Sequence, residues 1–229
     1  MIGRDMTQSL IHSAGLVTSG PRPVDALDVF GGRQPEGESL LGAHARLHQD
    51  GGGVVLLTGP RGVGKAQLLG GLRQSVIRSG KGPVFSGSAM GQHRPYGPVA
   101  DAVREALTHL DGMGVGGEVR NRHQSALAVL DPSQLARPDA AFMAPSRLAF
   151  QDATLALLRD IGLRTTVTFI LSELEESDED TRALCRYAAL HLCTDGNKGG
   201  CILVLSLVDD RGDDATTTCL LYTSPSPRD

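Results

Sequence analysis

Short runs of apolar residues alternate along the chain with longer segments in which apolar residues recur every three or four positions. The short runs are typical of strands buried on both faces of a sheet, and the longer segments are typical of amphipathic helices. Strands are predicted over residues 53–58, 83–87, 166–171 and 201–207. Helices are predicted over residues 38–48, 66–78, 99–110, 146–161 and 178–192, with Gly162 ending the fourth.

Strands that alternate with helices imply right-handed crossovers between neighbouring parallel strands. We therefore expect an α/β fold of three layers, in which helices cover both faces of a mainly parallel sheet. Residues 111–139 are rich in glycine at their start and carry only a weak helical pattern. This stretch predicts loops around one short helix.

A glycine-rich loop lies between the first predicted strand and the helix that follows it. Its sequence is Gly59-Pro60-Arg61-Gly62-Val63-Gly64-Lys65-Ala66. This matches the phosphate-binding motif G-x-x-x-x-G-K-[ST], in which backbone N–H groups surround phosphate oxygens and the lysine reaches the β- and γ-phosphates. A simple glycine-rich turn with an exposed lysine is the alternative, but the strand before it and the helix after it favour the phosphate-binding loop. We predict that these eight residues bind ATP or ADP.

Two positions that usually address Mg²⁺ in such proteins are changed. Ala66 replaces the Ser or Thr whose hydroxyl ligates the metal. At the end of the third predicted strand, Ser172 stands where an aspartate is usual, and Glu173 takes the place of the second acid. Mg²⁺ binding is therefore uncertain, with Ser172 and Glu173 as the candidate metal residues and Glu173 as the candidate catalytic base. Ser206, at the end of the fourth strand, is a candidate sensor of the γ-phosphate.

The acids that follow Glu173 allow two interpretations. Glu175 and Glu176 either reach the metal from the same turn or form the solvated start of the next helix, whose acids would complement the helix dipole. The pattern favours neither interpretation for these two residues.

Cysteine and histidine residues give no metal motif. Cys185, Cys193 and Cys201 lack a C-x-x-C pair and are predicted to be buried, reduced thiols. His44 and His48 lie four residues apart on a predicted helix, with no carboxylate motif beside them. We expect these two histidines on the solvated face of the helix.

Composition excludes several classes of function. The chain has 229 residues and a formal net charge of −4, which gives no broad basic field for nucleic acid. It has no apolar run long enough to cross a membrane, and residues 1–20 lack the apolar centre of a signal peptide. We expect a soluble, cytoplasmic protein that contacts neither membrane nor, through this portion, nucleic acid.

The chain divides into three parts. Residues 1–27 are predicted to be an N-terminal extension, and residues 28–218 the nucleotide-binding domain. Residues 219–229 read like an in-frame translation of a sequencing adapter, with a disordered Pro/Ser tail as the alternative. We expect these last residues to be foreign and the native chain to continue beyond Thr218, and we exclude them from the predicted fold.

Several motifs around the loop carry a family resemblance. They are Phe30-Gly31-Gly32-Arg33-Gln34-Pro35-Glu36 before the first helix, Gln67-Leu68-Leu69 after the loop, and Pro95-Tyr96-Gly97-Pro98 at a later helix start. With the acidic turn at 172–178, they make residues 29–210 resemble the AAA-type, origin-recognition-like domain of STAND signalling ATPases. That family belongs to the P-loop NTPases.

The resemblance implies an ATP-binding switch in a multidomain signalling or transcriptional regulator. Its expected partners are the nucleotide, other domains of the same full-length chain and further copies of itself. Ala66, Ser172 and Val208, which stands where the family commonly has an arginine, imply weak or absent hydrolysis. Whether the protein is an enzyme stays open. An active Mg²⁺-dependent ATPase using Glu173 and a non-enzymatic scaffold with a vestigial pocket are the alternatives, and a role in DNA replication has less support.

Overall fold

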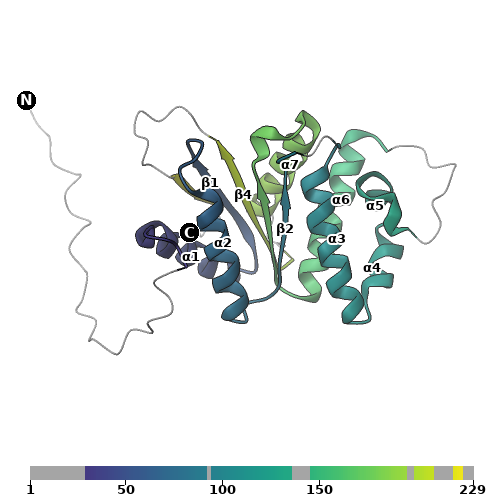
Figure 1. Cartoon of the computed structure of the whole chain (residues 1–229). Helices are drawn as coiled ribbons and strands as arrows, with labels where there is room; N and C mark the ends of the chain where they lie inside the picture. The colour runs from purple at the N-terminus through teal and green to yellow at the C-terminus, as the bar shows by residue number, and fades with distance from the viewer. Residues whose placement is uncertain (1–28, 92–93, 136–144, 195–198, 209–218, 224–229) are drawn as a thin grey trace, which may run out of the picture.

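The computed structural model describes residues 29–91, 94–135, 145–194, 199–208 and 219–223. The predicted N-terminal extension, residues 1–27, lies outside the described residues. The described elements form the expected α/β fold, with helices on both sides of one sheet (Figure 1).

The sheet follows the order β2-β3-β4-β1-β5. Its strands are β1 (Gly53–Gly59), β2 (Val84–Ser88), β3 (Val167–Ser172), β4 (Cys201–Val208) and β5 (Cys219–Thr223). The first four are mutually parallel, as the alternation of strands and helices predicts, whereas β5 runs antiparallel to β1. The carboxyl ends of the parallel strands therefore meet at one edge of the sheet.

Each of the four parallel strands sends alternate side chains into two separate parts of the core. On one face, Val55 and Ile170 pack against α1 (Gln34–Gln49) and α2 (Lys65–Arg78). On the other face, Val54 and Phe169 join a larger cluster. That cluster includes residues of α3 (Gly97–Gly112), α4 (Gly116–Arg122), α5 (Gln124–Leu130), α6 (Arg147–Arg164) and α7 (Glu179–Thr194). Burial on both faces explains why the strands read as continuous apolar runs.

The predicted helices differ from the structure most clearly in three places. Helix α1 begins at Gln34 rather than at residue 38. Residues 111–139 contain two short helices, α4 and α5, and a 3₁₀ turn, η2 (Pro132–Gln134), where one short helix was expected. Helix α6 also continues past Gly162 to Arg164. Gly162 is needed for packing rather than for ending the helix, because a Cβ there would lie 2.1 Å from the backbone carbonyl oxygen of Gly199.

The segment excluded from the predicted fold contributes a strand. Residues Cys219–Thr223 form β5, which pairs with β1 from Val54 to Thr58. An edge strand offers unpaired N–H and C=O groups to any apolar segment that can reach it. The pairing follows from that edge chemistry, and the foreign origin of residues 219–229 stays a prediction.

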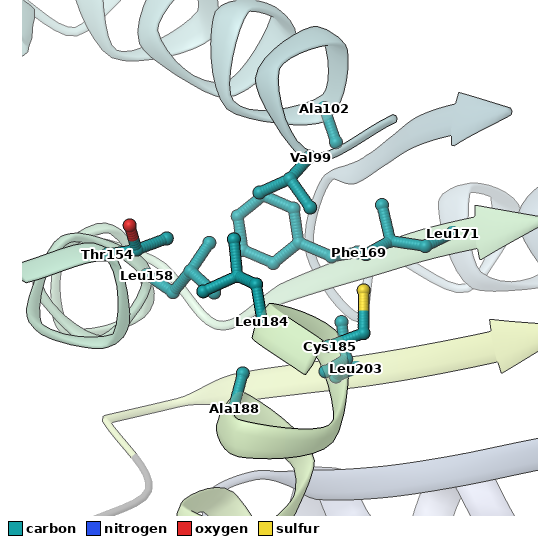
Figure 2. Close-up of a pocket in the computed structure, with 10 residues that line it drawn as sticks. All are labelled: Val99, Ala102, Thr154, Leu158, Phe169, Leu171, Leu184, Cys185, Ala188 and Leu203. Atoms are coloured by element: carbon teal, nitrogen blue, oxygen red, sulfur yellow. The ribbon is translucent and has the colours of Figure 1, made fainter. Parts of the chain in front are cut away.

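A small cavity lies in the larger part of the core. It has a volume of about 10 Å³ and is lined by side chains from α3, α6, α7, β3 and β4 (Figure 2). The hydroxyl of Thr154, on α6, is buried there and has no hydrogen-bond partner among the described residues. The cavity is too small for a nucleotide, so it is not the predicted nucleotide site. No helix in the described ranges has both the length and the apolar character needed to cross a bilayer.

Candidate functional site

The glycine-rich loop connects β1 to α2, as the sequence predicts. Gly62 and Gly64 have φ angles of 74° and 91°, in the left-handed region that glycine adopts without strain. Gly64 is the N-cap of α2, which has neither a side-chain cap nor an acidic residue in its first turn. The positive end of the helix dipole is therefore open to an anion at the loop.

Lys65 folds back over the loop. Its Nζ donates hydrogen bonds to the carbonyl oxygens of Gly59, at 2.7 Å, and Pro60, at 2.9 Å. The side chain is half-buried in this position. A phosphate oxygen that enters the loop would replace these two carbonyl acceptors, so the ammonium group is already close to where phosphate would bind.

A cleft of about 880 Å³ opens beside the loop at the carboxyl edge of the sheet. Its volume suits a nucleotide-sized ligand. The predicted site residues that line it are Arg61, Gly62, Gly64, Lys65, Ala66, Ser172, Glu173 and Ser206. Gly59, Pro60 and Val63 belong to the loop but are not among the residues that line the cleft. The fold thus brings the ends of β3 and β4 to the predicted phosphate-binding loop.

Glu173 follows β3 in a conformation that is unusual for a non-glycine residue, with φ of 57°. Its carboxylate accepts a hydrogen bond from the hydroxyl of Ser88, at the end of β2. The backbone N–H of Ala89, the residue after β2, donates to the carbonyl oxygen of Ser172 at 3.0 Å. These contacts orient Glu173. The role of Ser88 was not predicted, because Ser88 lies 85 positions before Glu173 in the sequence.

Glu175 and Glu176, in the 3₁₀ turn η3 (Leu174–Glu176), each have a protein partner. Glu175 accepts a hydrogen bond from the backbone N–H of Val208 at 3.1 Å. Glu176 forms an ion pair with Arg61 of the loop. The two carboxylates therefore link η3 to the end of β4 and to the loop.

Arg33 also contacts the loop, and it was not among the predicted site residues. Its guanidinium donates to the carbonyl oxygen of Val63 and pairs with Glu36, with Nη2 and Oε1 2.9 Å apart. A backbone hydrogen bond, and then Arg33, hold the pKa of the Glu36 carboxyl below its ordinary value. An arginine and a glutamate three residues apart, at the start of α1, could have predicted this ion pair.

The histidine prediction is wrong for His44. This side chain is 1% exposed and shares a hydrogen bond of 2.8 Å with the hydroxyl of Thr168 on β3. Burial first, and then the nearby charges of His48 and Lys81, lower its pKa to about 4. His44 was expected in solvent because it lies four residues from His48, on a helix face predicted to point outward. In the structure, α1 packs on the sheet through the face that carries His44.

The cysteine prediction holds for two of the three thiols. Cys185 and Cys201 are buried, and Cys193 is half-buried. Burial raises the pKa of Cys185 and of Cys201 to about 12. The ranges that the structure describes contain no group of three or more His, Cys, Asp or Glu side chains that could hold a metal ion.

A parallel sheet with a glycine-rich loop between β1 and α2, and a cleft at its carboxyl edge, defines a P-loop NTPase. The family model described as "AAA ATPase domain" matches residues 29–203. The chain belongs to this family. A search of curated proteins finds no match to it.

The family implies Mg²⁺ beside the phosphates, but the residues present do not fit the ion. Position 66 carries a methyl group, and position 172 carries a neutral, half-buried hydroxyl. The carboxylate of Glu173, which lines the cleft, accepts a hydrogen bond from Ser88. Mg²⁺ prefers near-octahedral oxygen ligands that include carboxylates.

Proposed function

We propose that the chain is the ATP-binding switch module of a STAND-type, cytoplasmic, multidomain signalling or transcriptional regulator, with weak or absent hydrolysis. The observation that carries the proposal is the loop itself. Gly59, Gly64 and Lys65 keep the phosphate-binding pattern and stand beside a nucleotide-sized cleft, whereas Ala66 and Ser172 occupy the two metal positions. The motifs at 30–36 and 95–98 support the STAND assignment.

In this proposal, binding exchanges contacts that the protein now makes with itself. The ammonium group of Lys65 leaves the carbonyl oxygens of Gly59 and Pro60 for the β- and γ-phosphates. Arg61 lies at the mouth of the cleft and is 70% exposed, so it can turn from Glu176 toward a phosphate. Ser206, 2% exposed at the end of β4, is the candidate γ-phosphate sensor.

Replacing Lys65 with alanine tests nucleotide binding. Charge-assisted hydrogen bonds contribute about 1.5–3 kcal/mol, so Lys65→Ala should weaken ATP binding by roughly 10- to 100-fold in a calorimetric titration. Lys81→Ala is the matched control, because Lys81 is exposed and does not line the cleft. Equal affinity in the Lys65→Ala variant and the unaltered protein would overturn the proposal.

A Mg²⁺-dependent ATPase is the second candidate function. The observation that favours it is the position of Glu173 in the cleft, with its carboxylate fixed by Ser88. A working ATPase predicts Mg²⁺-dependent phosphate release that disappears in Glu173→Gln and persists in Glu175→Gln. A non-enzymatic scaffold predicts no nucleotide affinity at all.

We also propose that the partners of this module are other domains of its own full-length chain and further copies of it. Nucleotide binding would then promote assembly. Sedimentation velocity with and without ATP tests this, and an unchanged sedimentation coefficient for the full-length protein at saturating ATP would contradict it.

A further inference from the structure

We propose that the cleft binds its nucleotide as the metal-free anion, so that Mg²⁺ contributes nothing to affinity. This rests on the proposed nucleotide-binding function and specifies the form of the ligand. Three features carry it: the loss of the metal's usual ligands, the engagement of every carboxylate in the acidic turn, and the positive charge that the protein itself supplies.

Neither usual metal position can coordinate the ion well. In a P-loop ATPase, a hydroxyl in the first turn of the helix and a carboxylate at a strand end address Mg²⁺. Here the first position is the exposed methyl group of Ala66, and the second is the uncharged Ser172. Both side chains line the cleft, so the ion would meet one group that is not a ligand and one that brings no charge.

The carboxylates of the following turn are engaged elsewhere. Glu173 accepts a hydrogen bond from Ser88, and Glu175 accepts one from the backbone N–H of Val208. Glu176 pairs with Arg61. These contacts tie the three carboxylates to β2, β4 and the loop, so a carboxylate that moved to replace the ligands lost at positions 66 and 172 would have to leave its partner.

Protein groups can supply the positive charge that the metal usually provides. Lys65 lines the cleft next to the loop, whereas the charge of Arg61 is already paired with Glu176. The first turn of α2 has no acidic residue and no side-chain cap, so its N–H groups add partial positive charge at the same place. Because Mg²⁺ would neutralise part of the phosphate charge without gaining protein ligands, the free anion interacts more strongly with these groups than its Mg²⁺ complex does.

The test compares ATP affinity, by calorimetry, in EDTA and in excess Mg²⁺. The expected result is an affinity in EDTA equal to or greater than that in Mg²⁺. Tightening by Mg²⁺ of more than about threefold would overturn the inference while leaving nucleotide binding intact. Failure to bind ATP in either buffer would instead overturn the proposed function.

A second experiment restores the usual metal ligands at positions 66 and 172. The double variant Ala66→Ser/Ser172→Asp should bind ATP at least about tenfold more tightly in Mg²⁺ than in EDTA. The matched control, Ala66→Val/Ser172→Asn, adds side-chain volume without a carboxylate or a loop hydroxyl and should show no such difference. A double variant that folds, as judged by circular dichroism, yet gains no response to Mg²⁺ would show that these two positions do not control the metal requirement and would overturn the inference.

Discussion

At the scale of single residues, burial of the His44 ring makes the stability of the whole domain depend on pH. The ring is fixed against Thr168 of β3, and burial lowers its pKa to about 4 from an ordinary value of 6.5. Above pH 6.5 the ring is neutral in both the folded and the unfolded chain. Between pH 6.5 and pH 4 the unfolded chain takes up a proton that the folded chain excludes, so this residue destabilises the fold as the pH falls.

The expected slope is up to about 1.4 kcal/mol of unfolding free energy per pH unit within that window. Urea titrations from pH 7 to pH 4 should show that His44→Gln, which can still hydrogen-bond to Thr168, loses part of the acid sensitivity. His109→Gln is the control, since His109 is exposed and is not among the groups that lower the pKa of His44, so the slope should persist. Equal acid sensitivity in the His44→Gln variant and the unaltered protein would contradict the assignment.

At the scale of elements, two adjacent glycines of α2 have opposite surroundings. Gly70 faces open space, and a Cβ there would meet no atom within 4 Å. A Cβ on Gly71 would lie 2.5 Å from the ring of Phe30 and 2.9 Å from the carbonyl oxygen of Val29. The ring of Phe30 also fills the space beside Gly37 of α1, so it joins the two helices that cover this face of the sheet.

Thermal unfolding of the two alanine variants should therefore shift in opposite directions. Gly70→Ala should gain about 0.5–1 kcal/mol, because alanine loses less backbone entropy in a helix. Gly71→Ala should lose about 1–3 kcal/mol, because the added methyl group overpacks the contact with Phe30. At about 2–4 °C per kcal/mol for a domain of this size, both shifts are measurable. A Gly71→Ala variant as stable as Gly70→Ala would mean that Phe30 does not join α1 to α2.

Local patterns predicted the elements, but not the contacts between them. Every strand of the parallel sheet and every long helix follows from apolar spacing, and the loop residues follow from a motif that is contiguous in sequence. Gly162 was misread because its reason is the approach of Gly199, 37 positions further along the chain. Ser88 was missed as a site residue, and the pairing of Glu176 with Arg61 was not predicted, for the same reason. The partners Glu173 and Arg61 are distant in sequence from Ser88 and Glu176 and meet them only through the sheet order.

At the scale of the whole molecule, one sheet separates two parts of the core but belongs to both. The candidate nucleotide loop extends from β1 into α2, on one face. Cys185 of α7 and Cys201 of β4 lie in the cluster on the other face, and both are buried with pKa values near 12. Such thiols react only when the structure around them opens. The rate at which these two thiols react therefore measures how much nucleotide binding at the loop stabilises the opposite face of the sheet.

A variant in which Cys193 and Cys219 are replaced by serine isolates these two thiols for labelling with a thiol reagent. If the domain unfolds as one cooperative unit, Cys185 and Cys201 should react at the same slow rate, which is set by the population of unfolded chains when refolding outpaces labelling. ATP at about 100 times its dissociation constant should slow both reactions by about 100-fold, because it binds only the folded state. Adding Lys65→Ala, which weakens ATP binding by about 10- to 100-fold, should reduce the slowing at the same ATP concentration to about 2- to 11-fold without removing the burial of either thiol. Faster labelling of Cys185 that does not respond to ATP would instead mean that α7 opens by itself, and that the face opposite the loop does not share the stabilisation that the nucleotide provides.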